Sequence, residues 1–343
     1  MLQAGTQPIT PSEAIALSVV IPLYNEQENV EPLCQALLGA LAGQPRSFEI
    51  ILVNDGSSDG TEARLEQAAA ADPRIRVVNF RSNKGQTAAM MAGIDYAVGT
   101  VIVPMDGDLQ NDPKDIVRLL DKLDEGYDVV SGWRRDRQDN FMIRTLPSRI
   151  ANLIISRVSG LPLHDYGCSL KAYRREVLQG FRLYGEMHRF IPIYAAAQGA
   201  RVAELPVSHH ARKFGQSKYG LNRTIKVLLD LLVVKFLTKY RTKPIYLFGQ
   251  AGVGLLLLAL LAGLWALYLK FFADTSFIQT PLPLLVSLCT IAGLMCLLMG
   301  LLAELIMRVY YESQSKTDYR VKSILNPRGG NFSNDDSRRS ATD

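Results

Sequence analysis

The fold is decided by the stretch Leu17-Ser-Val-Val-Ile-Pro-Leu-Tyr-Asn-Glu26, in which an apolar, β-branched run stops abruptly at polar side chains. Such a run predicts a buried strand at Leu17–Ile21, and a helical pattern follows near residues 26–42. Outward from it the same alternation continues, with strands predicted at Glu49–Val53, Ile75–Asn79, Val101–Pro104 and Asp128–Ser131 and helices near 59–71, 84–98 and 113–125. Strands that alternate with helices predict an α/β domain with a mostly parallel sheet.

Three polar clusters follow predicted strands, at Pro22–Glu26, Asn54–Gly60 and Asp106–Gln110. Ligands of open parallel sheets bind at the carboxyl ends of strands, so we expect the clusters to share one crevice. Asp106 and Asp108 are separated by one small residue, and their mutual repulsion favours a hard cation such as Mg²⁺ or Mn²⁺. Because Mg²⁺ is commonly held by one or two carboxylates together with substrate phosphates, the pattern favours a nucleotide diphosphate as ligand.

These clusters, together with Asn83-Lys-Gly-Gln86, resemble the ordered signature of family 2 glycosyltransferases with the GT-A fold, over about residues 17–220. Within that family the chain most resembles polyprenyl-phosphate glycosyltransferases such as dolichol-phosphate mannose synthase and bactoprenol glucosyltransferase. The resemblance implies that a hexose, with glucose from UDP-glucose as first expectation, moves with inversion to the phosphate of an undecaprenyl-type lipid. Mannose from GDP-mannose and an aminoarabinose donor stay open.

The resemblance also implies roles for individual residues. The nucleotide-sugar pocket is expected at Pro22, Tyr24, Glu26, Asp55, Lys84, Gly85 and Asp106, although Lys84 could equally be a solvated helix start. The metal is expected at Asp106, Asp108 and Gln110, and the catalytic set at Asp106, Asp108, Arg189 and Asp165. The acceptor phosphate is expected at Arg134, Arg144, Ser148 and Lys218, the last on a closing loop or a plain basic linker at Arg212–Tyr219. Asp165-Tyr-Gly-Cys-Ser-Leu-Lys171 departs from the family pattern at Gly-Cys-Ser and at Lys171.

Two segments without formal charge, Ile245–Leu269 and Pro281–Ala303, predict a hairpin of two transmembrane helices. As helices they reach roughly 35 Å, enough to cross a hydrocarbon core of about 30 Å. The alternative is a pair of buried core helices. Basic residues flank the hairpin on both sides, which predicts a multi-pass protein of the cell inner (cytoplasmic) membrane with the catalytic domain and both termini cytoplasmic. These flanking residues are Lys235, Lys239, Arg241 and Lys243 before it and Arg308, Lys316, Arg320 and Lys322 after it.

The domain boundaries follow from these patterns. We expect a disordered leader at 1–14, the catalytic domain at 15–220, an amphipathic juxtamembrane helix at 221–243, the transmembrane helices at 244–307 and a cytoplasmic tail at 308–343. Residues 323–343 are rich in polar residues and glycine, which predicts disorder. A basic amphipathic helix at 141–160 suits either the membrane interface or the surface of the sheet.

Gly293 and Gly300 lie on one helix face, which permits a homo-oligomer or simply faces lipid. The net charge of +5 is modest, and no nucleic-acid partner is expected. None of the four cysteines forms a CxxC pair, which argues against a zinc site, and the adjacent His209 and His210 are expected to be structural. Two other functions stay open: transfer to a saccharide or protein acceptor, and a non-catalytic membrane partner that binds nucleotide sugars.

Overall fold

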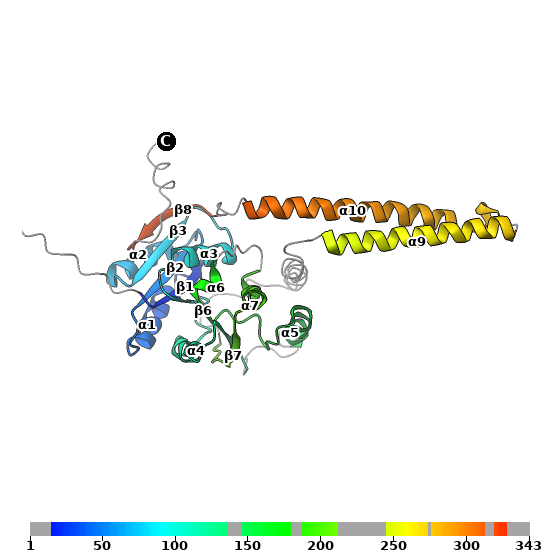
Figure 1. Ribbon diagram of the computed structural model, residues 1–343. Helices are drawn as coiled ribbons and strands as arrows, with labels where there is room; N and C mark the ends of the chain where they lie inside the picture. Colours follow the sequence, from blue (N-terminus) through cyan, green and yellow to red (C-terminus); the bar gives the residue numbers. More distant parts are fainter. Residues whose placement is uncertain are drawn as a thin grey trace, which may run out of the picture. The chain divides into compact units, whose positions relative to one another are not determined.

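The computed structural model describes residues 15–135, 146–179, 187–211, 245–273, 276–312 and 319–327. The chain divides into two compact units (Figure 1). The first comprises Met1–Leu231 together with Thr317–Asp343, and the second comprises Leu232–Lys316. The predicted juxtamembrane helix at 221–243 and the predicted loop Arg212–Tyr219 lie outside the described residues.

The first unit contains an eight-stranded sheet of order β7-β5-β6-β4-β1-β2-β3-β8. The pairs β1–β2, β1–β4, β2–β3 and β5–β7 are parallel, whereas β6 is antiparallel to β4 and β5, and β8 is antiparallel to β3. The mostly parallel sheet is thus confirmed, and the five predicted strands are correct to within two residues. The strands are β1 Leu17–Leu23, β2 Phe48–Asn54, β3 Ile75–Phe80, β4 Val101–Pro104, β5 Val129–Trp133, β6 Lys171–Arg174, β7 Val202–Pro206 and β8 Val321–Leu325.

Helices cover both faces of the central strands, whose residues are buried (Figure 1). Alternate β1 residues such as Val19 and Ile21 join a core with α1, α2 and α4, whereas Val20 contacts α3 through Gly93 on the other face. Burial on both faces explains why these strands are mainly apolar, although Ser18, Glu49 and Arg76 are buried within them. The helices are α1 Val30–Leu41, α2 Thr61–Ala71, α3 Gln86–Tyr96, α4 Asp115–Asp124, α5 Leu146–Ser159, α6 Arg175–Leu178 and α7 Ile191–Ala197, with a short 3₁₀ helix η2 at Met187–Phe190.

The tail prediction is wrong for residues 323–327, which are ordered. The chain returns after the second unit and adds β8 to the free edge of β3, where main-chain hydrogen bonds outweigh the polar composition of the segment. Asn326 secures the end of the strand by donating to the carbonyls of Ala69 at 2.7 Å and Ile75 at 2.8 Å. The Tyr319 ring stacks on Phe80 with centroids 5.1 Å apart. Strands β6 and β7 were also not predicted.

The second unit is a hairpin of α9 Ile245–Phe272 and α10 Leu282–Glu312, joined through a 3₁₀ turn, η3, at Phe277–Gln279. The helix backbones come close at two glycines: a Cβ added to Gly252 would lie 2.8 Å from the carbonyl oxygen of Gly293. The predicted hairpin is confirmed. Gly293 contacts α9 of the same chain. Assembly as a homo-oligomer stays a prediction.

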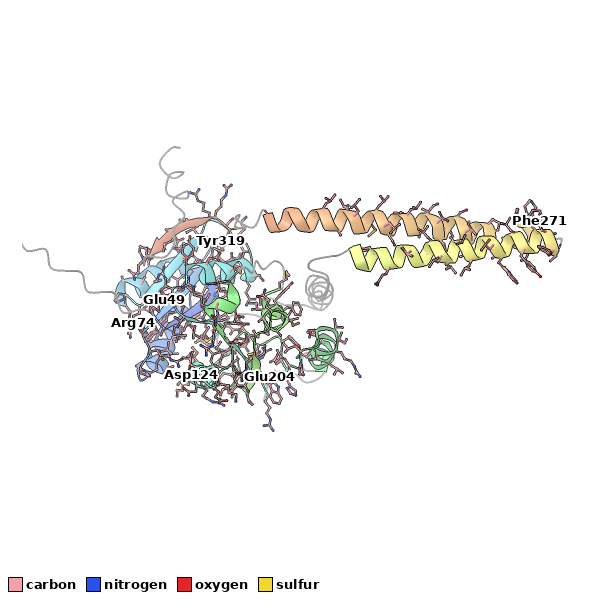
Figure 2. The ribbon with its side chains drawn as sticks, viewed as in Figure 1. Glu49, Arg74, Asp124, Glu204, Phe271 and Tyr319 are labelled. Carbon is pink, nitrogen blue, oxygen red and sulfur yellow. The ribbon has the colours of Figure 1, made fainter. Side chains whose placement is uncertain are left out.

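The two helices present apolar side chains outward. Phe248–Phe272 and Leu282–Ala303 are long and apolar enough to cross a membrane, with mean hydropathy 2.2 and 2.4 and only 22% and 17% of residues buried. Among the described residues, all exposed large hydrophobic side chains except Leu153 and Ile154 lie between Val253 and Ile306. Figure 2 shows these side chains projecting from both helices, with Phe271 labelled. The alternative of two buried core helices is therefore wrong.

Candidate functional site

Hydrogen bonds join the loops that follow β1, β2 and β3 at the carboxyl edge of the sheet. The Asp55 carboxylate accepts the backbone N–H groups of Lys84 at 2.7 Å and Gly85 at 2.9 Å, while its own N–H donates to the Leu23 carbonyl at 2.9 Å. Burial raises the pKa of Asp55, although these hydrogen bonds and the Lys84 charge oppose the rise. Asp55, Lys84 and Gly85, three of the seven residues predicted for the nucleotide-sugar pocket, are thus brought together.

The loop after β1 is held in the same way. Glu26 donates its N–H to the Thr61 hydroxyl at 3.0 Å, and its carboxylate accepts from the Asn29 amide at 2.5 Å. Pro22 is the sixth residue of β1, and Tyr24 follows the strand directly. These residues therefore lie at the edge that carries Asp55.

Asp106 and Asp108 form a turn directly beyond β4. The Gln86 amide donates to Asp106 at 2.6 Å, and the Gln110 N–H donates to Asp108 at 3.2 Å. Burial raises the pKa of Asp106, and the negative charge of Asp108 raises it further. A Cβ at Gly107, between them, would lie 2.3 Å from Leu23 Cδ2, so a larger residue there requires the Leu23 side chain to shift.

The two carboxylates suit a divalent cation that shares its coordination with phosphate oxygens. Within the described part of the chain, no three His, Cys, Asp or Glu side chains gather into a metal site. Two close carboxylates that disfavour each other's charge fit a cation completed by substrate oxygens. The Gln110 side chain donates to the His210 carbonyl at 3.4 Å, and its role as a metal ligand stays a prediction.

Two guanidinium groups border the turn that carries Gly167. A Cβ added to Gly167 would lie 3.1 Å from Arg134 Nη2 and 3.3 Å from Arg189 Nη1. Both positive charges lower the pKa of Asp106, although less than burial and Asp108 raise it. Arg134, Arg189 and the carboxylate turn therefore lie within electrostatic reach of one another, which was not evident from their separation in the sequence.

Arg134 is held by Asp165 in a bidentate ion pair, with Nε and Nη2 donating at 2.7 and 3.0 Å. Asp165 also accepts the Gly167 N–H at 3.0 Å. Burial is the largest single influence on the pKa of Arg134 and lowers it. The charge and hydrogen bonds of Asp165, together with the nearby Cys168 and Asp106, outweigh burial, so the net pKa lies above the ordinary value. The structure makes Asp165 a positioning residue for Arg134, and a catalytic role for it stays a prediction.

Sequence reasoning gave no role to Gln86, Ser169 or His188. Ser169 accepts the Asp106 N–H at 3.3 Å and the Asn111 amide at 3.0 Å, and the His188 ring contacts the Thr87 hydroxyl at 2.7 Å. Gln86 belongs to the motif Asn83–Gln86 and Ser169 to the motif Asp165–Lys171, so their positions in these motifs could have indicated a role in the site. Arg144 and Lys218 lie outside the described residues, as does the side chain of Ser148 on α5.

The sequence profile described as glycosyl transferase family 2 matches residues 18–181. The dodecaprenyl-phosphate galacturonate synthase of Rhizobium johnstonii is 40% identical over 332 residues, which cover 94% of this chain and 98% of that protein. The chain belongs to glycosyltransferase family 2. A second relative, the undecaprenyl-phosphate 4-deoxy-4-formamido-L-arabinose transferase of Shewanella sediminis, is 36% identical over 90% of this glycosyltransferase and 92% of its own length.

Solved structures resemble the glycosyltransferase at lower identity. A mannosyltransferase from Pyrobaculum calidifontis in complex with GDP-Man and Mn²⁺ is 21% identical, with a TM-score of 0.46 over 69% of this chain and 68% of its own. Glucosyl-3-phosphoglycerate synthase from Mycobacterium tuberculosis in complex with Mg²⁺ and UDP is 19% identical, with a TM-score of 0.49 over 64% and 79%. The expected GT-A fold of the catalytic unit is confirmed.

Proposed function

We propose that this glycosyltransferase moves a sugar from a nucleoside diphosphate to the phosphate of a polyprenyl lipid at a membrane surface. The observation that carries the proposal is the carboxylate turn of Asp106 and Asp108 beside the guanidinium groups of Arg134 and Arg189. Such a site suits two phosphate-bearing substrates. The apolar hairpin supports a lipid acceptor, because it would hold the enzyme where that acceptor resides.

Galacturonate is the donor sugar that we propose first. The relative at 40% identity is named for galacturonate and the relative at 36% identity for 4-deoxy-4-formamido-L-arabinose. Glucose from UDP-glucose, the first expectation from the sequence, has no counterpart in these two names. UDP-galacturonic acid is therefore the leading donor, with UDP-glucose as the comparison.

The proposed reaction is a single displacement at the sugar. A phosphate monoester has a second pKa near 6, so the lipid phosphate is mostly ionised at neutral pH and needs no strong general base. One of its oxygens forms a bond to C1 while the bond from C1 to the donor diphosphate breaks, which inverts C1 and releases the nucleoside diphosphate. Arg134 and Arg189 would orient and neutralise the phosphate groups. A bound Mg²⁺ or Mn²⁺, held by Asp106 and Asp108 with Gln110, would neutralise charge on the leaving diphosphate.

The membrane arrangement is also a proposal. The hairpin would span the inner membrane twice, with the catalytic unit and the tail on the cytoplasmic side, as the basic flanks predict. Undecaprenyl phosphate is the acceptor to test, and assembly as a homo-oligomer belongs to the same proposal.

The test measures transfer of labelled sugar to undecaprenyl phosphate by the purified full-length protein. UDP-galacturonic acid, UDP-glucose and GDP-mannose are supplied in parallel, with Mg²⁺, Mn²⁺ or EDTA. Asp108→Asn should reduce the organic-extractable product by about a hundredfold or more. The control Asp121→Asn, at an exposed position of α4, should retain it.

Each outcome distinguishes the candidate functions. A metal-dependent lipid product supports the proposal and identifies the sugar. Hydrolysis of the donor without a lipid product would contradict the lipid acceptor and favour a saccharide or a protein as the acceptor. Nucleotide binding without any turnover would favour a non-catalytic membrane partner, and full activity of Asp108→Asn would contradict the metal assignment.

A further inference from the structure

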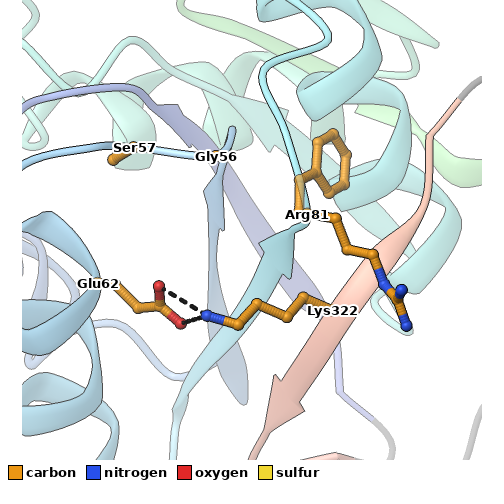
Figure 3. Close-up of a pocket in the computed structure, with 6 residues that line it drawn as sticks. Gly56, Ser57, Glu62, Arg81 and Lys322 are labelled. Carbon is orange, nitrogen blue, oxygen red and sulfur yellow. Dashed lines mark hydrogen bonds and ion pairs between the residues drawn. The ribbon is translucent and has the colours of Figure 1, made fainter. Parts of the chain in front are cut away.

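The tail strand β8 borders the loop that follows β2. A cavity of about 400 Å³ is lined by Gly56 and Ser57 of that loop, by Phe80 and Arg81 at the end of β3, and by Glu62 and Lys322. Figure 3 shows Lys322 reaching from β8 to Glu62 across this cavity, at 2.8 Å. The segment after the hairpin therefore comes close to the loop that contains Asp55, a residue of the proposed donor pocket.

Polar side chains connect β8 to this loop along one row of the sheet. The register pairs Asn54 of β2 with Asn79 of β3, and Asn79 with Ser323 of β8. The Asn79 side-chain NH₂ group donates to the Ser323 hydroxyl at 3.1 Å, and the Asn54 side-chain NH₂ group donates to Asn79 Oδ1 at 3.0 Å. Asn54 and Asn79 are each 1% exposed and Ser323 is half-buried, so the hydrogen bond between the two asparagines is shielded from solvent.

The loop after β2 determines which atoms donate and which accept in this row of hydrogen bonds, which we call the ladder. The Asn54 side-chain oxygen accepts the backbone N–H of Ser57 at 3.0 Å, which turns its NH₂ group toward Asn79. Asn79 must then present its oxygen to Asn54 and its NH₂ group to β8. An acceptor is required at position 323, and the serine hydroxyl provides it.

Beyond Ser57 the hydrogen bonds continue into the loop after β1. The Ser57 hydroxyl accepts the N–H of Asn25 at 3.0 Å, and the Asn25 side chain accepts the N–H of Ser58 at 2.9 Å. Asn25 has a φ of 51°, a left-handed conformation that asparagine tolerates better than most residues because its short side chain can form local hydrogen bonds. Its chain neighbours are Tyr24 and Glu26, both expected in the donor pocket.

We propose that Ser323 is a positioning residue for the donor pocket, acting through the ladder Ser323–Asn79–Asn54–Ser57–Asn25. Removing its hydroxyl leaves the buried Asn79 NH₂ group without an acceptor. Asn79 must then reorient, which sets it against Asn54 and loosens the hold on Ser57 and Asn25. The strand that follows the hairpin would thereby control how well the two donor loops are ordered.

The first test is hydrogen–deuterium exchange on the full-length protein in detergent. Ser323→Ala should increase amide exchange in segments 22–29 and 54–61, and Ser323→Thr, which keeps the hydroxyl, should restore the wild-type pattern. Lys322→Gln is the matched control: it removes the neighbouring ion pair with Glu62, leaves the ladder intact and should not change segment 22–29. Unchanged exchange in Ser323→Ala would overturn the proposal.

The second test separates binding from turnover. Leaving a buried hydrogen-bond donor unsatisfied should weaken binding of the nucleotide sugar by about fivefold or more. Ser323→Ala should therefore raise KM for the nucleotide sugar by about that factor. Its kcat should stay near the wild-type value, because the Asp106–Asp108 turn is not part of the ladder. A fall in kcat with unchanged KM would contradict the assignment.

The inference depends on the proposed function only for the identity of the pocket's ligand. Calorimetric titration with UDP and with GDP measures that ligand without an acceptor or a reaction. If UDP binds to the wild-type protein and binds about fivefold more weakly to Ser323→Ala, the inference stands even when no sugar is transferred. If neither nucleotide binds, the donor-pocket assignment is wrong, and exchange in segments 22–29 and 54–61 still decides whether Ser323 orders the loops.

Discussion

Arg134 and Asp165 form a bidentate ion pair at the centre of the candidate site, with two guanidinium nitrogens 2.7 and 3.0 Å from the two carboxylate oxygens. The Arg134 side chain is 15% exposed and that of Asp165 is 4% exposed, so solvent screens the pair weakly. A guanidinium group that is already held in place can bind a phosphate group without having to reorganise during the reaction. The pair therefore holds one guanidinium in place beside the Asp106–Asp108 turn.

We expect Asp165→Ala to lower the free energy of unfolding by about 3–5 kcal/mol, because it leaves the Arg134 charge buried and uncompensated. The double variant Arg134→Ala/Asp165→Ala should lose less than the sum of the two single variants. Thermal unfolding of all four proteins measures this coupling. Activity should fall about tenfold or more in Asp165→Asn, which stays neutral opposite Arg134. Additive losses in the cycle would show that the pair does not act as a unit.

Gly56 and Gly39 provide a contrasting pair of glycines. Gly56 has a φ of 65°, and a Cβ there would lie 2.5 Å from the backbone carbon of Ser82, so Gly56→Ala must displace the loop after β2. We expect a loss of about 2 kcal/mol or more in stability and weaker UDP binding. Gly39→Ala on α1 meets nothing within 4 Å and should gain about 0.5–1 kcal/mol. Chemical denaturation and calorimetry check both variants, and equal effects would contradict the steric argument.

Lys171 is one of the residues at which the chain departs from the family pattern, and it should make the stability of the protein depend on pH. It is 2% exposed and donates to the carbonyls of Cys168 and Tyr166, and burial lowers its pKa below the ordinary 10.5. Between the lowered folded-state pKa and 10.5, the unfolded chain holds a proton that the folded chain lacks. Stability should therefore rise with pH across that window.

Lys171→Met should remove this rise, since methionine does not titrate, whereas the exposed control Lys114→Met should keep the wild-type profile. Melting temperatures from roughly pH 7 to pH 10 measure the slope. Identical slopes in wild type and Lys171→Met would show that Lys171 does not contribute to it.

The sequence predicted the elements with a continuous apolar signal and missed the contacts made between distant segments. Strands β1 to β4 are buried on both faces, so each appears as a mainly apolar segment that is followed by polar residues. β8 lies directly before a polar segment, and that composition obscured its strand signal. Its apolar residues Val321, Ile324 and Leu325, ending at Asn326-Pro327, were the available strand signal.

In the candidate site, too, residues that are adjacent in the sequence were predicted together, whereas contacts between distant residues were not. The residues of Asp106–Gln110 were predicted together because they are adjacent in the chain. The partners Arg134 and Asp165 are 31 residues apart, and Asn79 and Ser323 are 244 apart. Which polar side chains meet over such separations depends on sheet order and register, which hydrophobic periodicity does not specify.

The hairpin offers the last prediction, because its two helices meet at glycines. A Cβ at Gly252 would lie 2.8 Å from the Gly293 carbonyl oxygen, and a Cβ at Gly293 would lie 2.9 Å from Leu256. A branched side chain at Gly252 must therefore separate the helices, which associate in a membrane chiefly through such close packing. Gly252→Val should lower the melting temperature in detergent, whereas Gly254→Val, on a face with nothing within 4 Å, should not. Similar melting temperatures for both variants would mean that the close approach contributes little to the stability of the hairpin.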